Sequence, residues 1–268
     1  GGIDLLNNIK SEGLDPKALM YIMNCSDLDY IRKNGGNRLS IGAAARLSDI
    51  EVHPEMIAHF PAFRKSVNVI GGTQIRNMAT LAGNVCNASP GADTPPVLIV
   101  LGAEATISKS EGNGSSSSRT VPVEQIFAGV KKTVLEPVEL LSEISVPIPP
   151  EHSGHSFRRL ARVRLDIAKI NCAVYIEREG TSIKTLRICF GSVAKTPVRI
   201  PTVESMLTGK EFTRDAVDRA SESVNHDISP ITDVRSTAEY RMQVAPVLLR
   251  EALDEAWEMA GGRNKKQV

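Results

Sequence analysis

The residues with the greatest capacity for chemistry lie between Gly71 and Pro96, where the chain reads GGTQIRNMATLAGNVCNASPGADTPP. Small, hydroxylated and amide side chains crowd this segment, and such residues let a backbone approach a ligand closely. A pyrophosphate group would suit them, because each charge-assisted hydrogen bond to phosphate contributes about 1.5–3 kcal/mol. Asp93 is then a candidate acceptor for sugar hydroxyls. The alternative is a tightly wound connector that binds nothing.

A second glycine-led segment, Gly1-Gly2-Ile3-Asp4-Leu5, stands at the start of the chain. Alone it indicates little, because Gly-Gly is also a common remnant of expression. The sequence contains no G-x-G-x-x-G after a strand, no H-E-x-x-H and no G-x-S-x-G. His152 and His155 stand three residues apart in an expected loop, which is a weak basis for a metal site.

The composition is that of an ordinary globular protein, with 41% hydrophobic and 24% charged residues. A formal net charge of +1 gives no electrostatic reason to expect nucleic acid or a membrane surface as a partner. No apolar run reaches the roughly 18 residues that predict a membrane span, and no signal peptide is visible. We therefore expect a cytoplasmic protein, and its 268 residues favour two domains.

The four cysteines are widely spaced and form no C-x-x-C pair. This spacing argues against zinc and against an iron–sulfur cluster with closely spaced ligands. Free thiols in a reducing compartment are the simplest interpretation. These residues are Cys25, Cys86, Cys172 and Cys189.

The first half of the chain predicts short elements separated by glycine and proline turns. We expect strands at residues 18–22, 38–42 and 104–108, and a flexible low-complexity loop at 111–118. Residues 46–70 should be mostly helical, with breaks near Pro54 and Pro61. Pro95 and Pro96 should open a short apolar helix that reaches Leu101.

A change of pattern near residues 152–154 divides the chain into residues 1–153 and 154–268. Alternating apolar residues at 170–176 and 186–190 then predict a half-buried antiparallel hairpin, which helices follow. Thr213 should cap one helix, and a Ser236–Glu239 capping box should open the last one. Pro246 should kink or split that helix, and Gly261-Gly262 should end it.

The distinctive segment resembles a signature, T-[IV]-G-G-N-x-x-[NT]-A-S-P-x-x-D, found in the flavin subunit of molybdenum hydroxylases. This is the family of xanthine dehydrogenase and carbon monoxide dehydrogenase. The matching residues are Thr80-Leu81-Ala82-Gly83-Asn84, Asn87-Ala88-Ser89-Pro90 and Asp93. Gly1–Leu5 is similar to the end of the family's A-G-G-T-D-L loop. Further similarity covers nearly the whole chain, at residues 74–77, 132–133, 139–141, 162–173, 190–199, 233–236 and 239–241.

The resemblance implies an α+β protein. Residues 1–153 would form a two-lobed FAD-binding domain of the PCMH type, with its first lobe truncated. Residues 154–268 would form the C-terminal domain of CO dehydrogenase flavoproteins, an α+β domain with a small antiparallel sheet and helices. Relatives carry a strand, a helix and another strand before the position of Gly1, which leaves open whether FAD is retained without them.

The resemblance also implies which residues hold FAD. Two loops would grip the pyrophosphate, and Ser89 and Asp93 would support the phosphate and sugar. Ile70 and Leu141 would lie against the rings, unless they serve only in core packing, and Arg158 would be a cation near the flavin. The full set is Gly1, Gly2, Ile3, Asp4, Leu5, Ile70, Thr80, Ala82, Gly83, Asn84, Ser89, Asp93, Leu141 and Arg158. Ile3 replaces the family's threonine and Ala82 replaces a glycine, which removes one hydroxyl and adds one methyl.

The implied function is electron transfer inside a larger complex. Its partners would be a molybdopterin-containing large subunit and a small subunit with [2Fe-2S] clusters. Electrons would pass from the clusters to FAD, and from there to NAD or another acceptor, with no catalytic side chain in this chain. Two alternatives remain: an assembly scaffold that has lost flavin binding, and an independent FAD oxidoreductase.

Overall fold

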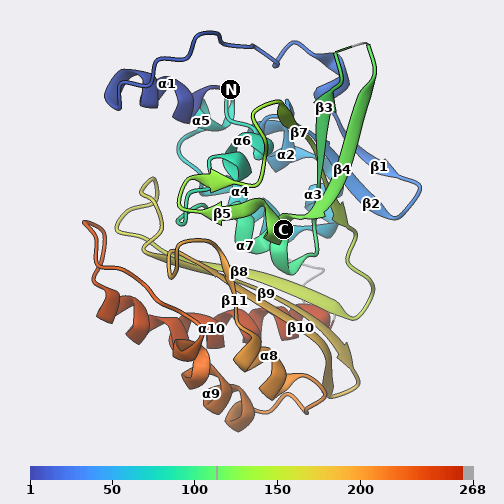
Figure 1. Ribbon diagram of the computed structural model, residues 1–268. Helices are drawn as coiled ribbons and strands as arrows, with labels where there is room; N and C mark the ends of the chain where they lie inside the picture. The colour runs from blue at the N-terminus through green and yellow to red at the C-terminus, as the bar shows by residue number, and fades with distance from the viewer. Residues whose placement is uncertain (113, 262–268) are drawn as a thin grey trace.

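Two antiparallel sheets organise the chain (Figure 1). The computed structural model describes residues 1–112 and 114–261. One sheet has the strand order β1-β2-β7-β3-β4, and the other has the order β11-β10-β9-β8, while β5 and β6 form a small separate ribbon. The first sheet contains β1 (Ile31–Asn34), β2 (Arg38–Gly42), β3 (Glu104–Ser110), β4 (Ser116–Pro122) and β7 (Glu139–Pro147). The others are β5 (Phe127–Gly129), β6 (Lys132–Thr133), β8 (Ser153–Leu160), β9 (Ile170–Glu179), β10 (Ser182–Gly191) and β11 (Val198–Arg199).

Short helices connect the strands of the first half, and α4 and α7 pack against the sheet β8–β11. Pro54 and Pro61 each stand at the first position of a helix, so both expected breaks in the 46–70 segment are confirmed. The apolar helix that was expected to start at the proline pair is also present. These elements are α1 (Ile3–Ser11), η1 (Ser26–Leu28), α2 (Leu47–Val52), α3 (Pro54–His59), α4 (Pro61–Asn68), α5 (Thr73–Arg76), α6 (Leu81–Cys86), α7 (Thr94–Val100) and η2 (Val123–Ile126).

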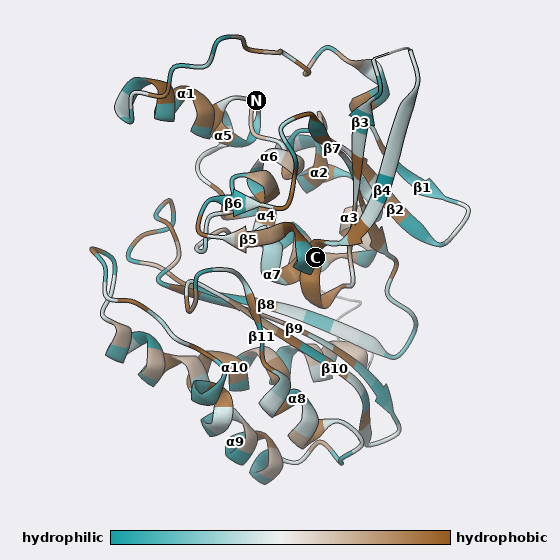
Figure 2. Cartoon of the chain, viewed as in Figure 1, coloured by the Kyte–Doolittle hydropathy of each residue, from teal (hydrophilic) through white to brown (hydrophobic). Residues whose placement is uncertain are grey.

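The sheet β8–β11 is covered on both faces. Along β9, Cys172, Val174 and Ile176 point to one side and pack with the C-terminal helices. Ala173 and Tyr175 point to the other side and join the core of the first half. Helices α4 and α7 lie on this second face, and all residues of α7 are buried. The brown part of α7 in Figure 2 is its apolar part. The division at residues 153 and 154 stays a proposal, and the packing crosses it.

The C-terminal helices are α8 (Pro201–Leu207), α9 (Arg214–Glu222), η3 (Ser223–His226) and α10 (Ala238–Ala260). Thr213 caps α9 as expected, because its hydroxyl accepts from the N–H of Ala216. Helix α10 lies so close to β8 that a Cβ at Gly154 would stand 2.0 Å from the carbonyl oxygen of Ala256. Only glycine permits this approach.

Two expectations about local structure, the capping box at Ser236 and the strand at residues 18–22, were wrong. Thr237, and not Ser236, caps α10, because its hydroxyl accepts from the N–H of Tyr240. Helix α10 continues through the buried Pro246, so the split that was one expected outcome does not occur and tertiary packing outweighs the missing hydrogen bond. It ends with Gly261 at its C-cap, and Gly262 lies outside the described residues.

Residues 18–22 form no strand. Met20 is 89% exposed and Tyr21 is 69% exposed. A short apolar run predicts burial only where another element covers it, and nothing in the described chain covers this one. The low-complexity loop is also shorter than expected, because β4 begins at Ser116. None of the described helices is both long and apolar enough to cross a membrane.

Candidate functional site

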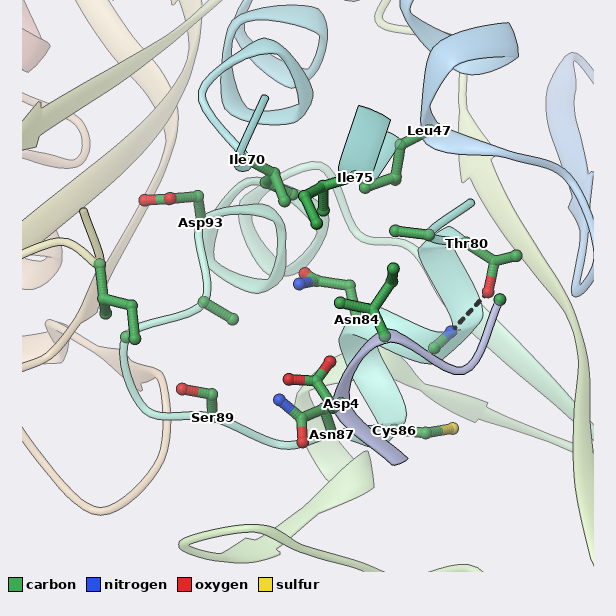
Figure 3. A pocket seen from close by; sticks show the side chains of 18 of the residues that line it. Asp4, Leu47, Ile70, Ile75, Thr80, Asn84, Cys86, Asn87, Ser89 and Asp93 are labelled. Atoms are coloured by element: carbon green, nitrogen blue, oxygen red, sulfur yellow. Dashed lines mark hydrogen bonds between the residues drawn. The ribbon is translucent and has the colours of Figure 1, made fainter. Parts of the chain in front are cut away.

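A cavity of about 520 Å³ lies between the start of the chain and the segment from Val69 to Asp93. Figure 3 shows Leu47, Ile70 and Ile75 on one side of it, with Asp4, Asn87 and Ser89 opposite. The loop between β8 and β9 completes the wall. The lining residues are Gly1, Gly2, Ile3, Asp4, Leu5, Asn8, Leu47, Val69, Ile70, Gly71, Ile75, Ala79, Thr80, Gly83, Asn84, Cys86, Asn87, Ser89, Gly91, Ala92, Asp93, Arg159, Leu165, Asp166 and Ile167.

The two glycine-containing segments predicted to act together meet at this cavity. A Cβ at Gly1 would lie 1.6 Å from the carbonyl oxygen of Met78, so the first residue packs on the backbone that leads into Thr80. Gly2 has φ +77°, a conformation that favours glycine, and it precedes α1. The expected flavin loop therefore passes directly into a helix, with Asp4 in its first turn.

The short helix α6 presents the polar wall of the cavity. Thr80 is its N-cap, and the Thr80 hydroxyl accepts from the N–H of Gly83 at 3.0 Å. A hydrogen bond from a buried residue orients the Asn84 side chain: the Thr94 hydroxyl donates to Asn84 Oδ1 at 2.6 Å. The Asn84 amide nitrogen takes part in no hydrogen bond among the described residues. It is therefore a free donor on the wall of the cavity.

Asp93 closes one end of the cavity in a buried network. Arg159 Nε donates to Asp93 Oδ1 and Oδ2 at 3.1 and 3.2 Å, and Asn171 Nδ2 donates to Oδ1 at 2.8 Å. Arg159 also donates to the carbonyl oxygens of Arg164 and Asp166 in the β8–β9 loop. Burial raises the pKa of Asp93 to about 6, against the opposing effects of Arg159 and Asn171. The carboxyl is thus mostly ionised at neutral pH, with its charge balanced by Arg159.

Three predicted site residues do not line the cavity. Leu141 is 1% exposed within β7 and belongs to the hydrophobic core of the first half. Ala82 faces the same core from the inner side of α6. Arg158 points to the opposite face of β8, where it forms ion pairs with Glu251 and Glu255 of α10. Its neighbour Arg159 faces the cavity instead, because successive side chains of a strand alternate between faces.

Several lining residues were missed by sequence reasoning. The apolar walls come from Leu47, Val69 and Ile75 on one side and from Leu165 and Ile167 on the other. Alternation along β8 places Arg158 and Arg159 on opposite faces, but it does not say which of them faces the cavity. No local pattern marks the others, since they reach the cavity from separate elements.

The site and the fold together define a class of protein: an α+β protein that binds an elongated cofactor with both polar and flat apolar parts. The cavity volume lies within the usual range of about 300–1,000 Å³ for small-molecule sites. Glycines at positions 1, 2, 71 and 83 line it, the Asn84 amide supplies a donor, and the apolar walls suit a ring system. These features fit FAD.

Comparison with known proteins identifies the family. Residues 1–149 match the model of the FAD binding domain in molybdopterin dehydrogenase, and residues 155–256 match the CO dehydrogenase flavoprotein C-terminal domain. The chain belongs to this family of FAD-binding medium subunits of molybdenum hydroxylases. FAD is its cofactor, and the chain is a subunit of an oxidoreductase.

The similarity extends over almost the full chain. The carbon monoxide dehydrogenase medium chain of Hydrogenophaga pseudoflava is 31% identical, over 96% of this chain and 88% of that protein. A putative xanthine dehydrogenase FAD-binding subunit of Escherichia coli is 29% identical, over 98% and 89%. A solved carbon monoxide dehydrogenase from Hydrogenophaga pseudoflava superimposes with a TM-score of 0.89 at 31% identity, over 96% of this chain and 87% of that one. The fold class expected from the sequence is thereby confirmed.

Proposed function

We propose that this chain transfers electrons through FAD held in the cavity, taking them from an iron–sulfur partner and passing them to NAD or another acceptor. The observation that carries this proposal is the meeting of two distant small-residue segments around one cavity, with the Asn84 amide as a free donor. The partners we propose are a molybdopterin-containing large subunit and a small [2Fe-2S] subunit. The names of the relatives, such as "medium chain", support a multi-subunit assembly.

The proposed roles follow from donor and acceptor chemistry. The Asn84 amide would donate to the pyrophosphate, beside the lining backbone of Gly1, Gly2 and Gly83. The carboxylate of Asp4 can only accept hydrogen bonds, so it suits a hydroxyl of the cofactor better than its phosphates. Ser89 would serve the same polar end.

The apolar and charged residues would hold the rest of the cofactor. Ile70, with Leu47 and Ile75, offers a surface for a ring system, and Ile3 and Leu5 add apolar atoms at the start of the chain. The flavin supplies the redox chemistry, while the protein positions it and excludes water. Among the described residues that line the cavity, Arg159 is the one with a lysine or arginine side chain, but Asp93 balances its charge. The site would thus present a neutral ion pair where the sequence suggested a free cation at Arg158.

FAD titration of the purified full chain tests the proposal. We expect a tight complex with quenched flavin fluorescence. Asn84→Asp is the sharpest variant, because it keeps the oxygen that accepts from Thr94 and replaces the donor by an anionic oxygen. It should weaken FAD binding by about a hundredfold or more, since a charge-assisted hydrogen bond becomes a repulsion.

Asn77→Asp is the matched control, because Asn77 is exposed and lies outside the cavity lining. It should bind FAD like the wild type. If the wild type takes up no FAD, the chain is better described as an assembly scaffold. If the native preparation contains FAD but no molybdenum or iron partner, an independent flavin oxidoreductase is favoured.

A further inference from the structure

Two segments that the cofactor site does not explain meet behind the cavity. They are residues 190–199, at the end of β10, and residues 233–241, which lead into α10. Neither segment contributes a lining residue. Their meeting point is Ser192, which has φ +64° and so adopts a conformation that non-glycine residues seldom take.

Ser192 holds both loops that wall one side of the cavity. Its N–H donates to the carbonyl oxygen of Pro90 at 2.7 Å, and its hydroxyl donates to the carbonyl oxygen of Ala168 at 3.0 Å. Pro90 belongs to the loop that carries Ser89 and Asp93, and Ala168 follows Ile167. At Gly91 a Cβ would lie 2.7 Å from Ile167 Cγ2 and 3.1 Å from Ser192 Oγ, so the two loops are packed tightly at this point.

Arg241 fixes Ser192 in turn. This side chain is buried, and the residue is only 3% exposed. Its Nη1 donates to the carbonyl oxygen of Ser192 at 2.8 Å, and its Nη2 donates to Asp233 Oδ1 at 2.7 Å. Asp233 also accepts from the backbone N–H groups of Arg235 and Ser236. These hydrogen bonds keep the pKa of Asp233 low, at about 2, although its burial acts in the opposite direction. The carboxylate therefore stays charged and paired.

We propose that Ser192, Asp233 and Arg241 form a clamp that positions the two cavity loops, residues 89–93 and 165–168, for the cofactor. The clamp residues are positioning residues, because they act through backbone carbonyls and do not line the cavity. The proposal rests on the proposed function in taking FAD as the occupant. Helix α10, which carries Arg241, would thus help to position the cofactor site without lining the cavity.

The test compares arginine variants on the same helix. Arg241→Met removes both clamp hydrogen bonds, and Arg241→Lys retains the charge. Arg250→Met is the matched control, because Arg250 lies on α10 and pairs with Glu222 at 2.9 Å, away from the cavity lining. FAD affinity, the visible circular dichroism of bound flavin and amide hydrogen exchange of the unliganded full chain are measured for each.

Arg241→Met should lower FAD affinity by about tenfold or more, because the charge-assisted hydrogen bonds to the Ser192 carbonyl and to Asp233 are lost and Ser192 no longer holds the two loops in a fixed position. It should also change the flavin dichroism and accelerate exchange at residues 88–93 and 164–168. Arg241→Lys should restore part of the affinity, and Arg250→Met should match the wild type in all three measurements.

The outcomes separate the clamp from the proposed function. If Arg241→Met loses stability but keeps FAD affinity, flavin dichroism and loop exchange like the control, the clamp proposal is overturned and Arg241 is structural only. If the wild type binds no FAD, the proposed function fails. The exchange data then decide alone whether Arg241 holds the loops.

Discussion

Arg158 and Arg159 are adjacent in the chain but serve opposite faces of β8. Arg158 pairs with Glu255 on the surface of α10, with a Nε–Oε2 distance of 2.8 Å and 34% of its side chain exposed. The side chain of Arg159 is 9% exposed and holds the equally buried Asp93. Removing one partner of a buried pair is far more costly than removing an exposed one, because the remaining charge stays uncompensated.

We therefore predict that Arg159→Met lowers the free energy of unfolding by about 3–5 kcal/mol, whereas Arg158→Met costs at most about 1 kcal/mol. The double variant Arg159→Met/Asp93→Asn should recover much of the loss, because the amide needs no counter-charge. Urea denaturation without FAD measures all of these. Equal losses for the two single variants would contradict the arrangement of β8 described above.

At the residue scale, the sequence was informative where side chains are small and ordered along the chain. The cluster around Thr80, Gly83 and Asn84 was predicted and does line the cavity. Leu141 and Arg158 were placed wrongly, because the face of a strand on which a residue lies depends on register, which a single sequence does not fix. Asp4 and Asp93 were identified as site residues, but the ion pair of Asp93 with Arg159 joins residues 66 positions apart and has no local signal.

At the scale of elements, His155 links β8 to α3. Its Nε2 lies 3.1 Å from the carbonyl oxygen of His59, and burial lowers the pKa of His155 to about 4. The unfolded chain takes up a proton near pH 6.5, about the ordinary histidine value, while the native imidazole stays neutral until about pH 4. The contribution of His155 to stability is therefore lost as the pH falls through this window.

His155→Gln should remove this dependence, because the amide can still donate to His59 and does not titrate. Between pH 6.5 and pH 4, the free energy of unfolding of the wild type should fall by on the order of 3 kcal/mol more than that of the variant. Asp93 acts in the opposite sense. Burial raises its pKa, so the free energy of unfolding falls as the pH rises from about 4 to about 6. The difference between the two proteins isolates His155. The exposed His226→Gln control should keep the wild-type slope.

The start of α10 gives a second prediction at this scale. Thr237→Ala removes the hydroxyl that accepts from the N–H of Tyr240 and should cost about 1 kcal/mol. Ser236→Ala should change stability by less than about 0.5 kcal/mol, because its backbone, and not its hydroxyl, bonds to Asp233. Chemical denaturation of both variants checks this. A larger effect of Ser236→Ala would support the capping box expected from the sequence.

Elements with proline or alternating patterns were located well. Pro54 and Pro61 set helix starts through local sterics, and the alternation over β9 and β10 predicted the hairpin. The hairpin was expected to be half-buried, but β9 is buried on both faces because helices cover the sheet on each side. The strand expected at residues 18–22 is absent, and the split expected as one outcome at Pro246 does not occur. Tertiary contacts decide whether an apolar run is covered and whether a helix survives an internal proline, and these contacts are absent from the local sequence.

At the scale of the whole molecule, the sheet β8–β11 belongs to two cores at once. Phe157, Ala173 and Cys189 complete the core of the first half, while Cys172 and Val174 face the C-terminal helices. Such sharing predicts one cooperative unfolding transition for the chain, although the family models divide it near residue 150.

Two probes can check this. Fluorescence of Trp257, the single tryptophan, reports on α10, where its ring stacks on Phe212 at 4.4 Å. Far-ultraviolet circular dichroism reports on the whole chain. The two curves should share one midpoint in urea, and two separated midpoints would show that the halves unfold independently.

The doubly covered sheet also bears on how the chain is made. During synthesis the N-terminal half emerges first. Helices α4 and α7 then exist before β8–β10 do, and about 90 further residues, from Val100 to Gly191, must be added before the sheet that covers their apolar faces is complete. We expect ribosome-bound chains that stop near residue 150 to need a chaperone, and chains extended beyond β10 to resist protease.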